Sequence, residues 1–293
     1  MSCILENEHI KVTINSHGAE LSSLIHKGTG VEHIWQADPA VWGRHAPHLF
    51  PIVGQLADHS YTLGKRIFPL SQHGFARDRE FVQEIRTEDK AVFTLRSDEE
   101  SLAVYPFRFR FSITYSIIVS KLSVGYQVSN EDDKPMWFSI GAHPGFACPF
   151  YEGERFEDYY LEFQHRETTS RMLFADGLLT GEKVLYLEKI NTIALASTTF
   201  DQDAIILHAL NSKYVDLKTR KHKRFLRFDF TGFPLLAFWS KPKANAPYIC
   251  IEPWYGVADT HGESKDFTQK AYIQSLEIGR QFHAKYSMEL CER

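Results

Sequence analysis

The sequence predicts an all-β protein, a large antiparallel β-sandwich, and three observations support this. Apolar and polar residues alternate strictly through the middle of the chain, from Phe107 to Ile117. Gly, Pro, Asn and Asp interrupt the other apolar runs at short intervals, and few segments have helical spacing. Many short strands with frequent turns and almost no helix are typical of a sandwich.

The central alternation predicts a β-hairpin with one buried face. Phe107 to Ile117 has an apolar residue at every second position, and Leu122 to Val128 repeats the pattern after a turn at Lys121. A repeat of two is that of a strand, because a helix would spread the same residues over its whole surface. The turn-rich Asn130 to Asp133 then ends the hairpin.

Other segments carry weaker forms of this signal. Ile10 to Ile14 alternates before a turn at His17-Gly18, and Gly279 to Leu290 alternates as a final strand. Asp38 to Trp42 and Asp98 to Val104 are the expected short helical turns. Further strands are expected at Ala19 to Ile25, Val31 to Trp35, Ala91 to Arg96, Tyr159 to Phe163, Ala204 to Leu207, Tyr214 to Leu217, Phe225 to Phe230 and Leu235 to Trp239. With neither a repeat nor a linker-like stretch, residues 1–293 are expected to form a single domain.

Composition narrows the classes of partner. The 33 Lys and Arg against 37 Asp and Glu give a net charge of -4, which does not predict nucleic-acid binding. The basic run Lys218 to Arg224 is interpreted as a solvated hairpin tip. Four scattered cysteines predict neither a disulfide framework nor a zinc site. With no signal segment and no apolar run of about 18 residues, we expect a cytoplasmic protein that does not enter membranes.

Four segments break the strand pattern in the same way, by setting a histidine or a carboxylate among glycine, proline and aromatic residues. Gly and Pro hold unusual backbone angles, which orients a polar side chain, and aromatic rings pack against the C–H faces of sugars. The segments are Trp42 to Pro51, Gln72 to Arg77, Gly141 to Phe146 and Ile251 to Gly256. Together they predict a sugar site.

Glu252 has the clearest chemical setting of these residues. It ends an apolar run, Pro247 to Ile251, and Pro253-Trp254 follows it directly. A carboxylate held there is partly removed from water, which raises its pKa toward the strength of a useful base. The alternative interpretation is a solvated strand end. For His73 and His143 the alternative is a structural hydrogen-bonding role.

Other chemistries have little support in the sequence. His45 and His48 lie three residues apart in a Pro-rich stretch, and no HExxH or His-x-His pattern involves the candidate histidines, so no metal site is expected. No Gly-x-Ser-x-Gly nucleophile motif and no glycine-rich phosphate loop occurs. We therefore expect no cofactor.

These segments resemble the aldose 1-epimerase (galactose mutarotase-like) superfamily, and most closely its LacX-type branch. The resemblance runs through nearly the whole chain and rests on five stretches in order: NSHGAEL from Asn15, RHAPHLFPIVG from Arg44, HGFARD from His73, GAHPGF from Gly141 and YICIEPWYG from Tyr248. It implies a β-supersandwich with a sugar cleft. It also implies an isomerase that interconverts the α and β anomers of an aldohexose or a related sugar by acid–base ring opening.

The resemblance also implies roles for individual residues. Glu252 matches the general base, His143 the general acid, and His73 a second histidine that polarises the ring oxygen. Arg44 matches an arginine that holds hydroxyls, although the local alignment also allows His48.

The other implied substrate contacts are less specific. Asp203 looks like the substrate-binding aspartate, with Asp201 and Asp216 as rivals. Trp254 is a candidate sugar platform, as are Trp239, Phe75 and Phe146, although an aromatic residue taken alone is more often part of the core.

The resemblance leaves the sugar and the activity open. The surroundings of His143 and Arg44 differ from the galactose-specific pattern and approach that of hexose-6-phosphate mutarotases, in which arginines bind the phosphate. Arg77 either has that role or forms an ion pair with Asp78. A non-catalytic sugar-binding or sensing protein would use the same cleft. A glycoside hydrolase would need a second carboxylate, such as Asp203, facing Glu252. The oligomeric state is not predicted.

Overall fold

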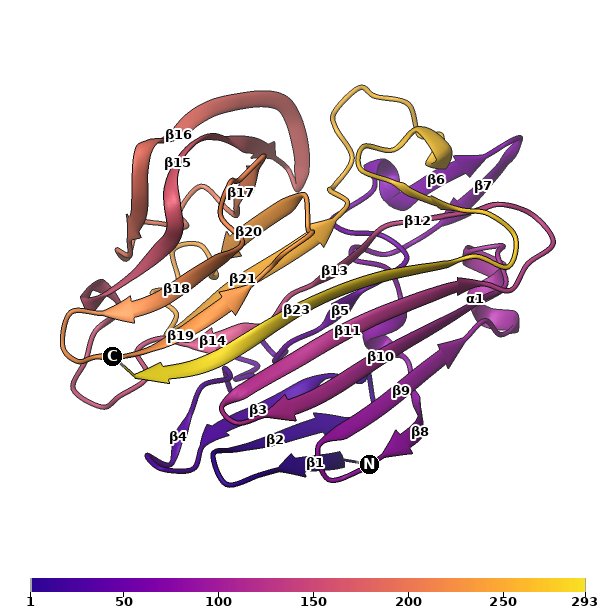
Figure 1. Ribbon diagram of the computed structural model, residues 1–293. Helices are drawn as coiled ribbons and strands as arrows, with labels where there is room; N and C mark the ends of the chain where they lie inside the picture. The colour runs from indigo at the N-terminus through magenta and orange to yellow at the C-terminus, as the bar shows by residue number, and fades with distance from the viewer. Residues whose placement is uncertain (1, 293) are drawn as a thin grey trace.

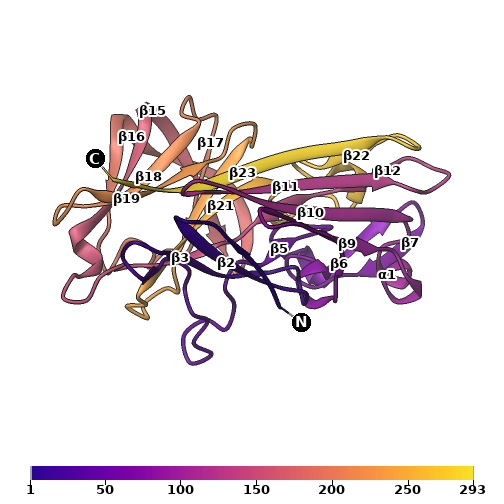
Figure 2. The same ribbon diagram turned by 60° about the horizontal axis from the view of Figure 1, so that its bottom comes forward.

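The computed structural model describes residues 2–292 and confirms the predicted all-β fold class (Figure 1). Strands β1, β2, β3 and β4 form a small antiparallel sheet in that order. It lies against the strands of a much larger sheet, as the two views in Figures 1 and 2 show. The strands of the small sheet are β1 (Ser2–Glu6), β2 (Ile10–Asn15), β3 (Leu21–His26) and β4 (Val31–Glu32).

Within residues 2–292, fifteen strands join in one antiparallel sheet, in the order β5-β13-β21-β20-β17-β15-β18-β19-β23-β11-β10-β9-β8, with β14 paired to β21 and β16 paired to β15. Its strands are β5 (His48–Leu49), β8 (Val82–Arg86), β9 (Lys90–Arg96), β10 (Phe109–Ile118), β11 (Lys121–Asn130), β13 (Ile140–Ala142), β14 (Gly145–Ala147), β15 (Tyr159–Ala175), β16 (Leu178–Ala194), β17 (Ile205–His208), β18 (Tyr214–Thr219), β19 (Arg224–Asp229), β20 (Leu235–Trp239), β21 (Tyr248–Tyr255) and β23 (Gln281–Glu292). The final strand β23 lies inside this sheet, between β19 and β11.

Short elements complete the fold. Strand β6 (Ser60–Leu63) pairs with β7 (Arg66–Pro69), and β12 (Met136–Phe138) pairs with β22 (Gln274–Leu276). The α-helix α1 (Glu99–Val104) begins where the Asp98 side chain accepts a hydrogen bond from the backbone N–H of Ser101, a standard N-cap. Single 3₁₀ turns occur at Ala57–His59, Ala76–Asp78, Phe156–Asp158 and Phe267–Gln269.

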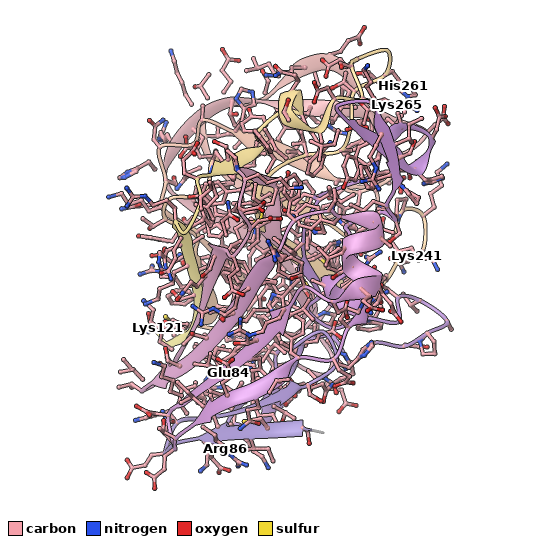
Figure 3. The ribbon with its side chains drawn as sticks, turned by 90° about the vertical axis from the view of Figure 1, so that its right-hand side faces the viewer. Glu84, Arg86, Lys121, Lys241, His261 and Lys265 are labelled. Carbon is pink, nitrogen blue, oxygen red and sulfur yellow. The ribbon has the colours of Figure 1, made fainter. Side chains whose placement is uncertain are left out.

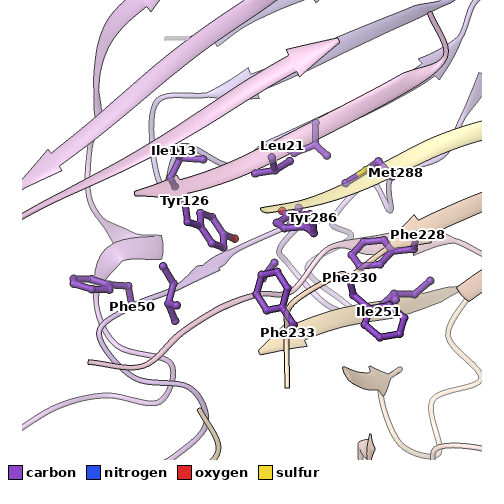
Figure 4. Close-up of a cluster of buried hydrophobic side chains, with 14 of the residues drawn as sticks. Leu21, Phe50, Ile113, Tyr126, Phe228, Phe230, Phe233, Ile251, Tyr286 and Met288 are labelled. Atoms are coloured by element: carbon purple, nitrogen blue, oxygen red, sulfur yellow. The ribbon is translucent and has the colours of Figure 1, made fainter. Parts of the chain in front are cut away.

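The predicted central hairpin forms the middle of the core. Phe109, Phe111, Ile113, Tyr115 and Ile117 of β10 are all buried, and β11 pairs with this strand along its full length. Their side chains belong to one hydrophobic cluster that also includes the inward faces of β1, β2 and β3. The cluster continues through aromatic residues of β19, β23 and the loops, several of which are labelled in Figure 4. The small sheet and the large sheet therefore share a core.

The longest hairpin was only partly predicted. Strand β15 begins at Tyr159 as expected but runs to Ala175, and its partner β16 was not predicted at all. Bulges shift the register of this pair four times, and β16 is largely exposed, so neither strand shows a clean alternation. Asp38 to Trp42 forms a single turn, as expected, in which the N–H groups of Val41 and Trp42 donate to the Asp38 carbonyl. The strand expected at Val31 to Trp35 is limited to Val31–Glu32.

Charged side chains lie mainly at the periphery. Figure 3 shows this for Glu84 and Arg86 on β8 and for Lys241, all of which are exposed. The basic run is a hairpin tip between β18 and β19, as predicted, although Lys218 itself is buried and paired with Glu162 and Asp216. In the described part of the chain, no helix is long and apolar enough to cross a membrane.

Candidate active site

Strand β21 places Glu252 at the floor of a cavity. Side chains alternate along a strand, so Cys250, Glu252 and Trp254 point to one side of β21 while Ile249 and Ile251 point into the main core. Glu252 is 1% exposed and pairs across the sheet with Ala237 of β20. The apolar run before Glu252 is thus a buried strand, as the sequence predicted.

His143 lies close to Glu252 because the segment that carries it is paired with β21 in the sheet. Strands β13 and β14 flank the His143-Pro144 pair, and Gly141 pairs with Trp254 while Gly145 pairs with Cys250. The backbone N–H of His143 also donates to the carbonyl of Pro47 at 3.1 Å. As a result His143 Nε2 lies 3.1 Å from Glu252 Oε2.

The glycines around His143 make room for tryptophans. A Cβ at Gly141 would lie 2.6 Å from Trp254, and one at Gly145 would lie 2.7 Å from Trp42. Both distances are too short for real Cβ contacts, so each glycine allows an indole to lie close to the backbone. Trp42 in turn packs against the His143 ring, with 5.0 Å between centroids. The GAHPG stretch is therefore glycine-rich for packing around the histidine.

His73 is held by a two-way hydrogen bond with Gly54. Its backbone N–H donates to the Gly54 carbonyl at 2.9 Å, and the Gly54 N–H donates to His73 Nδ1 at 3.1 Å. Since a backbone N–H always donates, Nδ1 carries no proton, and the neutral ring has its proton on Nε2. The His73 ring stands perpendicular to that of His143, with centroids 5.7 Å apart.

These residues line a cavity of about 280 Å³. Its aromatic walls are Trp42, Phe174, Trp239 and Trp254. The remaining lining residues are Pro47, Gly54, Gln55, Gln72, His73, Arg77, His143, Gly177, Asp203, Ala204, Pro242, Glu252 and Ala258. Aromatic walls with a few convergent polar groups are typical of a small-molecule site.

Burial shifts the ionisable groups of the cavity toward their neutral forms. It raises the pKa of Glu252 well above its usual range, and the nearby Asp203 carboxylate raises it further. Burial lowers the pKa of His143 to about 3 and puts that of His73 well below its ordinary value. The pKa of Arg77 falls to about 10, first through burial and then through repulsion by Arg44.

The cavity also contains polar atoms that lack partners. Among residues 2–292, buried side-chain atoms without a hydrogen bond include Arg77 Nε, His143 Nδ1, Glu252 Oε2 and Trp254 Nε1, all from cavity-lining residues. The 3.1 Å contact between His143 and Glu252 therefore lacks the alignment of a hydrogen bond. Buried polar groups are normally paired, so this group of atoms is suited to a polar ligand.

Most of the sequence-predicted site residues meet in this cavity. Glu252, His143, His73, Arg77 and Asp203 all line it, as does Trp254. The backbone N–H of Ala204 donates to Asp203 Oδ1 at 2.8 Å. The rival aspartates do not line the cavity: Asp201 lies beside a different, smaller pocket, and Asp216 is paired with Arg227 and Lys218.

Arg44 and His48 lie outside the cavity lining. Arg44 donates to Asp78 at 2.8 Å, close enough to the site to affect the pKa values of both cavity histidines. His48 is fully buried, with Nδ1 2.6 Å from the Tyr126 hydroxyl and Nε2 2.7 Å from that of Tyr115. Both of its ring nitrogens are occupied in the core, so His48 does not contact a ligand in this cavity.

Phe75 and Phe146 belong to the core, which was one of the two roles that the sequence left open for them, and they do not line the cavity. Residues that the sequence argument missed include Trp42, Gln55, Gln72 and Phe174. Trp42 and Gln72 stand at the ends of the quoted motif segments, which was a usable signal. Phe174 comes from the β15–β16 hairpin, where no pattern in the sequence indicated a site residue.

Comparison with known proteins agrees with this fold. The aldose 1-epimerase family model matches residues 1–271, and the chain belongs to this family. It is 36% identical to the plasmid-encoded protein LacX of Lactococcus lactis subsp. lactis over 285 residues, which cover 94% of this chain and 95% of LacX. The chromosomal LacX of the same organism is 35% identical over the same length and coverage.

Two solved structures are similar over almost their full lengths. A galactose mutarotase related enzyme from Lactobacillus acidophilus is 37% identical, with a TM-score of 0.96 over 100% of this chain and 98% of that one. A galactose mutarotase-like protein from Lactobacillus casei ATCC 334 is 31% identical, with a TM-score of 0.94 over 99% and 100%. The galactose mutarotase-like fold is thereby shown.

Proposed function

We propose that this protein is an aldose 1-epimerase that interconverts the α and β anomers of an aldohexose. The observation that carries the proposal is the contact between His143 Nε2 and Glu252 Oε2, 3.1 Å apart at the floor of a cavity with aromatic walls. A volume of about 280 Å³ suits one monosaccharide, at the small end of ligand sites. Membership of the aldose 1-epimerase family supports the same reaction.

In the forward direction Glu252 accepts the proton of the anomeric hydroxyl while His143 donates one to the ring oxygen. The bond between C1 and the ring oxygen breaks, and the open aldehyde forms. Rotation about C1–C2 presents the other carbonyl face, and the reverse transfers close the ring to the opposite anomer. A neutral His73 donates from Nε2 to a substrate oxygen. The reaction only moves protons, so this mechanism needs no cofactor.

The shifted pKa values fit this cycle because the pair shares one proton. An ionised Glu252 with a protonated His143 holds as many protons as a neutral Glu252 with a neutral His143. Burial favours the neutral arrangement, which is the one that follows ring opening and is ready for closure. The charged arrangement starts ring opening, and hydroxyl groups of a bound sugar stabilise it by hydrogen bonding to the unpartnered atoms.

Hexose 6-phosphates are the second candidate substrates, and Arg77 is the reason. Its side chain lines the cavity, its Nε makes no hydrogen bond, and one terminal nitrogen donates to the Gln72 carbonyl at 2.7 Å. Arg77 also lies 3.7 Å from Asp78, so the ion pair and the phosphate role remain alternatives for this residue.

A polarimetric assay tests the proposal. Freshly dissolved α-D-glucose, α-D-galactose and their 6-phosphates are followed with and without the protein, and at least one should equilibrate faster. If none does while a sugar still raises the melting temperature, the protein is a sugar-binding or sensing protein. Release of aryl alcohol from aryl glycosides would instead indicate a glycoside hydrolase, with Asp203 as the second carboxylate of the cavity.

A further inference from the structure

Cys250 brings a thiol to the acid–base pair. It precedes Glu252 by two residues on β21, so both side chains point to the same side of the strand. The possible ligand atoms of His143, Cys250 and Glu252 all lie within 4.8 Å of one another. Among residues 2–292, no other group of three His, Cys, Asp or Glu side chains is placed in this way.

The three groups form a donor set suited to zinc. Imidazole nitrogen, thiolate sulfur and carboxylate oxygen are the ligands that Zn²⁺ takes in proteins, at about 2.0–2.3 Å. Tetrahedral geometry separates the ligand atoms by roughly 3.3–3.8 Å, and the three atoms here already lie within 4.8 Å of one another. Three protein ligands leave the fourth position of a tetrahedral Zn²⁺ for water or another ligand, and two of them, His143 and Glu252, line the cavity.

A second observation points to a ligand at the same place. Glu252 Oε2 and His143 Nδ1 lack hydrogen-bond partners, although the two residues are only 1% and 8% exposed. Cys250 is 0% exposed, and burial raises the pKa of its thiol, so the thiol is neutral before a cation arrives. Coordination replaces the thiol proton, which leaves to the solvent.

We propose that His143, Cys250 and Glu252 bind a divalent cation, Zn²⁺, where His143 and Glu252 line the cavity and Cys250 lies buried beside them. A cation there coordinates both groups that the proposed mechanism uses for proton transfer, so it inhibits the enzyme and competes with the sugar. The site differs from a catalytic metal centre because the metal-free cavity is the active form. His143 lies far from Cys250 and Glu252 in the sequence, which is why no metal-binding pattern is visible there.

Cobalt absorption spectroscopy tests this binding without any sugar or assay of activity. Co²⁺ alone is titrated into the native protein, and we expect a 1:1 complex with intense visible bands of tetrahedral cobalt and a near-ultraviolet thiolate-to-cobalt band. Zn²⁺ should then displace the cobalt and bleach both. Native protein that shows no thiolate band overturns the proposal, whether or not the protein is a mutarotase.

Two cysteine variants locate the thiol. Cys250→Ser should remove the thiolate band and weaken Zn²⁺ binding by more than the roughly 10–100-fold cost of losing a hydrogen-bond partner of a ligand. Cys291→Ser, at a half-buried cysteine outside the cavity, should keep both. A thiolate band that persists in Cys250→Ser, or disappears only in Cys291→Ser, excludes Cys250 as a ligand. Near-ultraviolet circular dichroism confirms that each variant is folded.

Discussion

His143 Nε2 lies 3.1 Å from Glu252 Oε2 although the two residues are 109 positions apart in the sequence. Burial lowers the pKa of His143 and raises that of Glu252, which favours the neutral form of each residue. Strand pairing between β13, β14 and β21 creates this contact. The pair shares one proton, so its chemistry depends on both members.

Glu252→Gln should lower kcat for anomer exchange by about 10²–10⁴-fold, because an amide cannot accept the proton of the anomeric hydroxyl. Polarimetry on the fastest sugar measures this loss. Glu277→Gln, at an exposed position outside the cavity, is the matched control and should keep the native rate. Full activity in Glu252→Gln would show that the base is another residue.

His143→Asn and His73→Asn should separate the two cavity histidines. Loss of a general acid at His143 should lower kcat by about 10²–10⁴-fold. Loss of a neutral donor at His73 should cost only roughly 5- to 10-fold. Asn tolerates the positive φ of 64° at position 73, so that variant keeps its backbone. Exposed His9→Asn is the control. If kcat falls further in His73→Asn than in His143→Asn, His73 is the general acid and His143 the neutral donor.

Arg77→Gln should distinguish phosphorylated from free substrates. A charge-assisted hydrogen bond to phosphate is worth about 1.5–3 kcal/mol, so KM for a hexose 6-phosphate should rise at least about 10-fold. KM for the free hexose should change by less than about threefold, and exposed Arg280→Gln should change neither. An equal change of KM for the two sugars would mean that Arg77 forms its ion pair with Asp78 and does not bind the phosphate.

Gly74→Ala should destabilise the protein and disturb His73. Gly74 has a φ of 72°, and a Cβ there would lie 2.3 Å from the carbonyl oxygen of Phe50. The left-handed conformation alone costs about 1–2 kcal/mol for alanine, and the clash adds to it. Gly64→Ala is the control, because Gly64 has a φ of 60° but open space around its Cβ position. Urea unfolding should show a clearly larger loss for Gly74→Ala.

Acid should destabilise the protein through its buried histidines. Burial lowers the pKa of His33 to about 4 and that of His48 to about 3. Below about pH 6.5 the unfolded chain binds protons that these folded histidines do not, so the free energy of unfolding is greatest above that pH. It should fall by about 1.4 kcal/mol per pH unit for each histidine, down to about pH 4 for His33. Glu252 opposes this trend, because below its raised pKa the folded protein holds one carboxyl proton that the unfolded chain has released.

Urea titrations at about pH 7, about pH 6 and about pH 5 measure this slope. His33→Asn should reduce it by about one proton, whereas exposed His9→Asn should leave it unchanged. An equal slope in native protein and His33→Asn would mean that His33 is protonated in the folded state.

Much of the fold could be predicted where one face of a strand is buried and the other is not. The alternation from Phe107 to Ile117 is visible in the sequence because β10 packs its apolar face on the core and turns polar residues outward. Bulges and exposure remove that pattern from β15 and β16, so their extent was not predictable. The single-domain organisation of the chain stays a prediction.

The sequence by itself determined the fold class, the family and the residue types at the cavity floor, because local alternation and short motifs carry that information. Only the tertiary structure decided which of these residues meet. It placed His48 in a tyrosine network and Asp203 in the cavity, and it brought Cys250 beside the His143–Glu252 pair. The physical reason is strand pairing: neighbours across a sheet are set by register between distant segments, which no local pattern records.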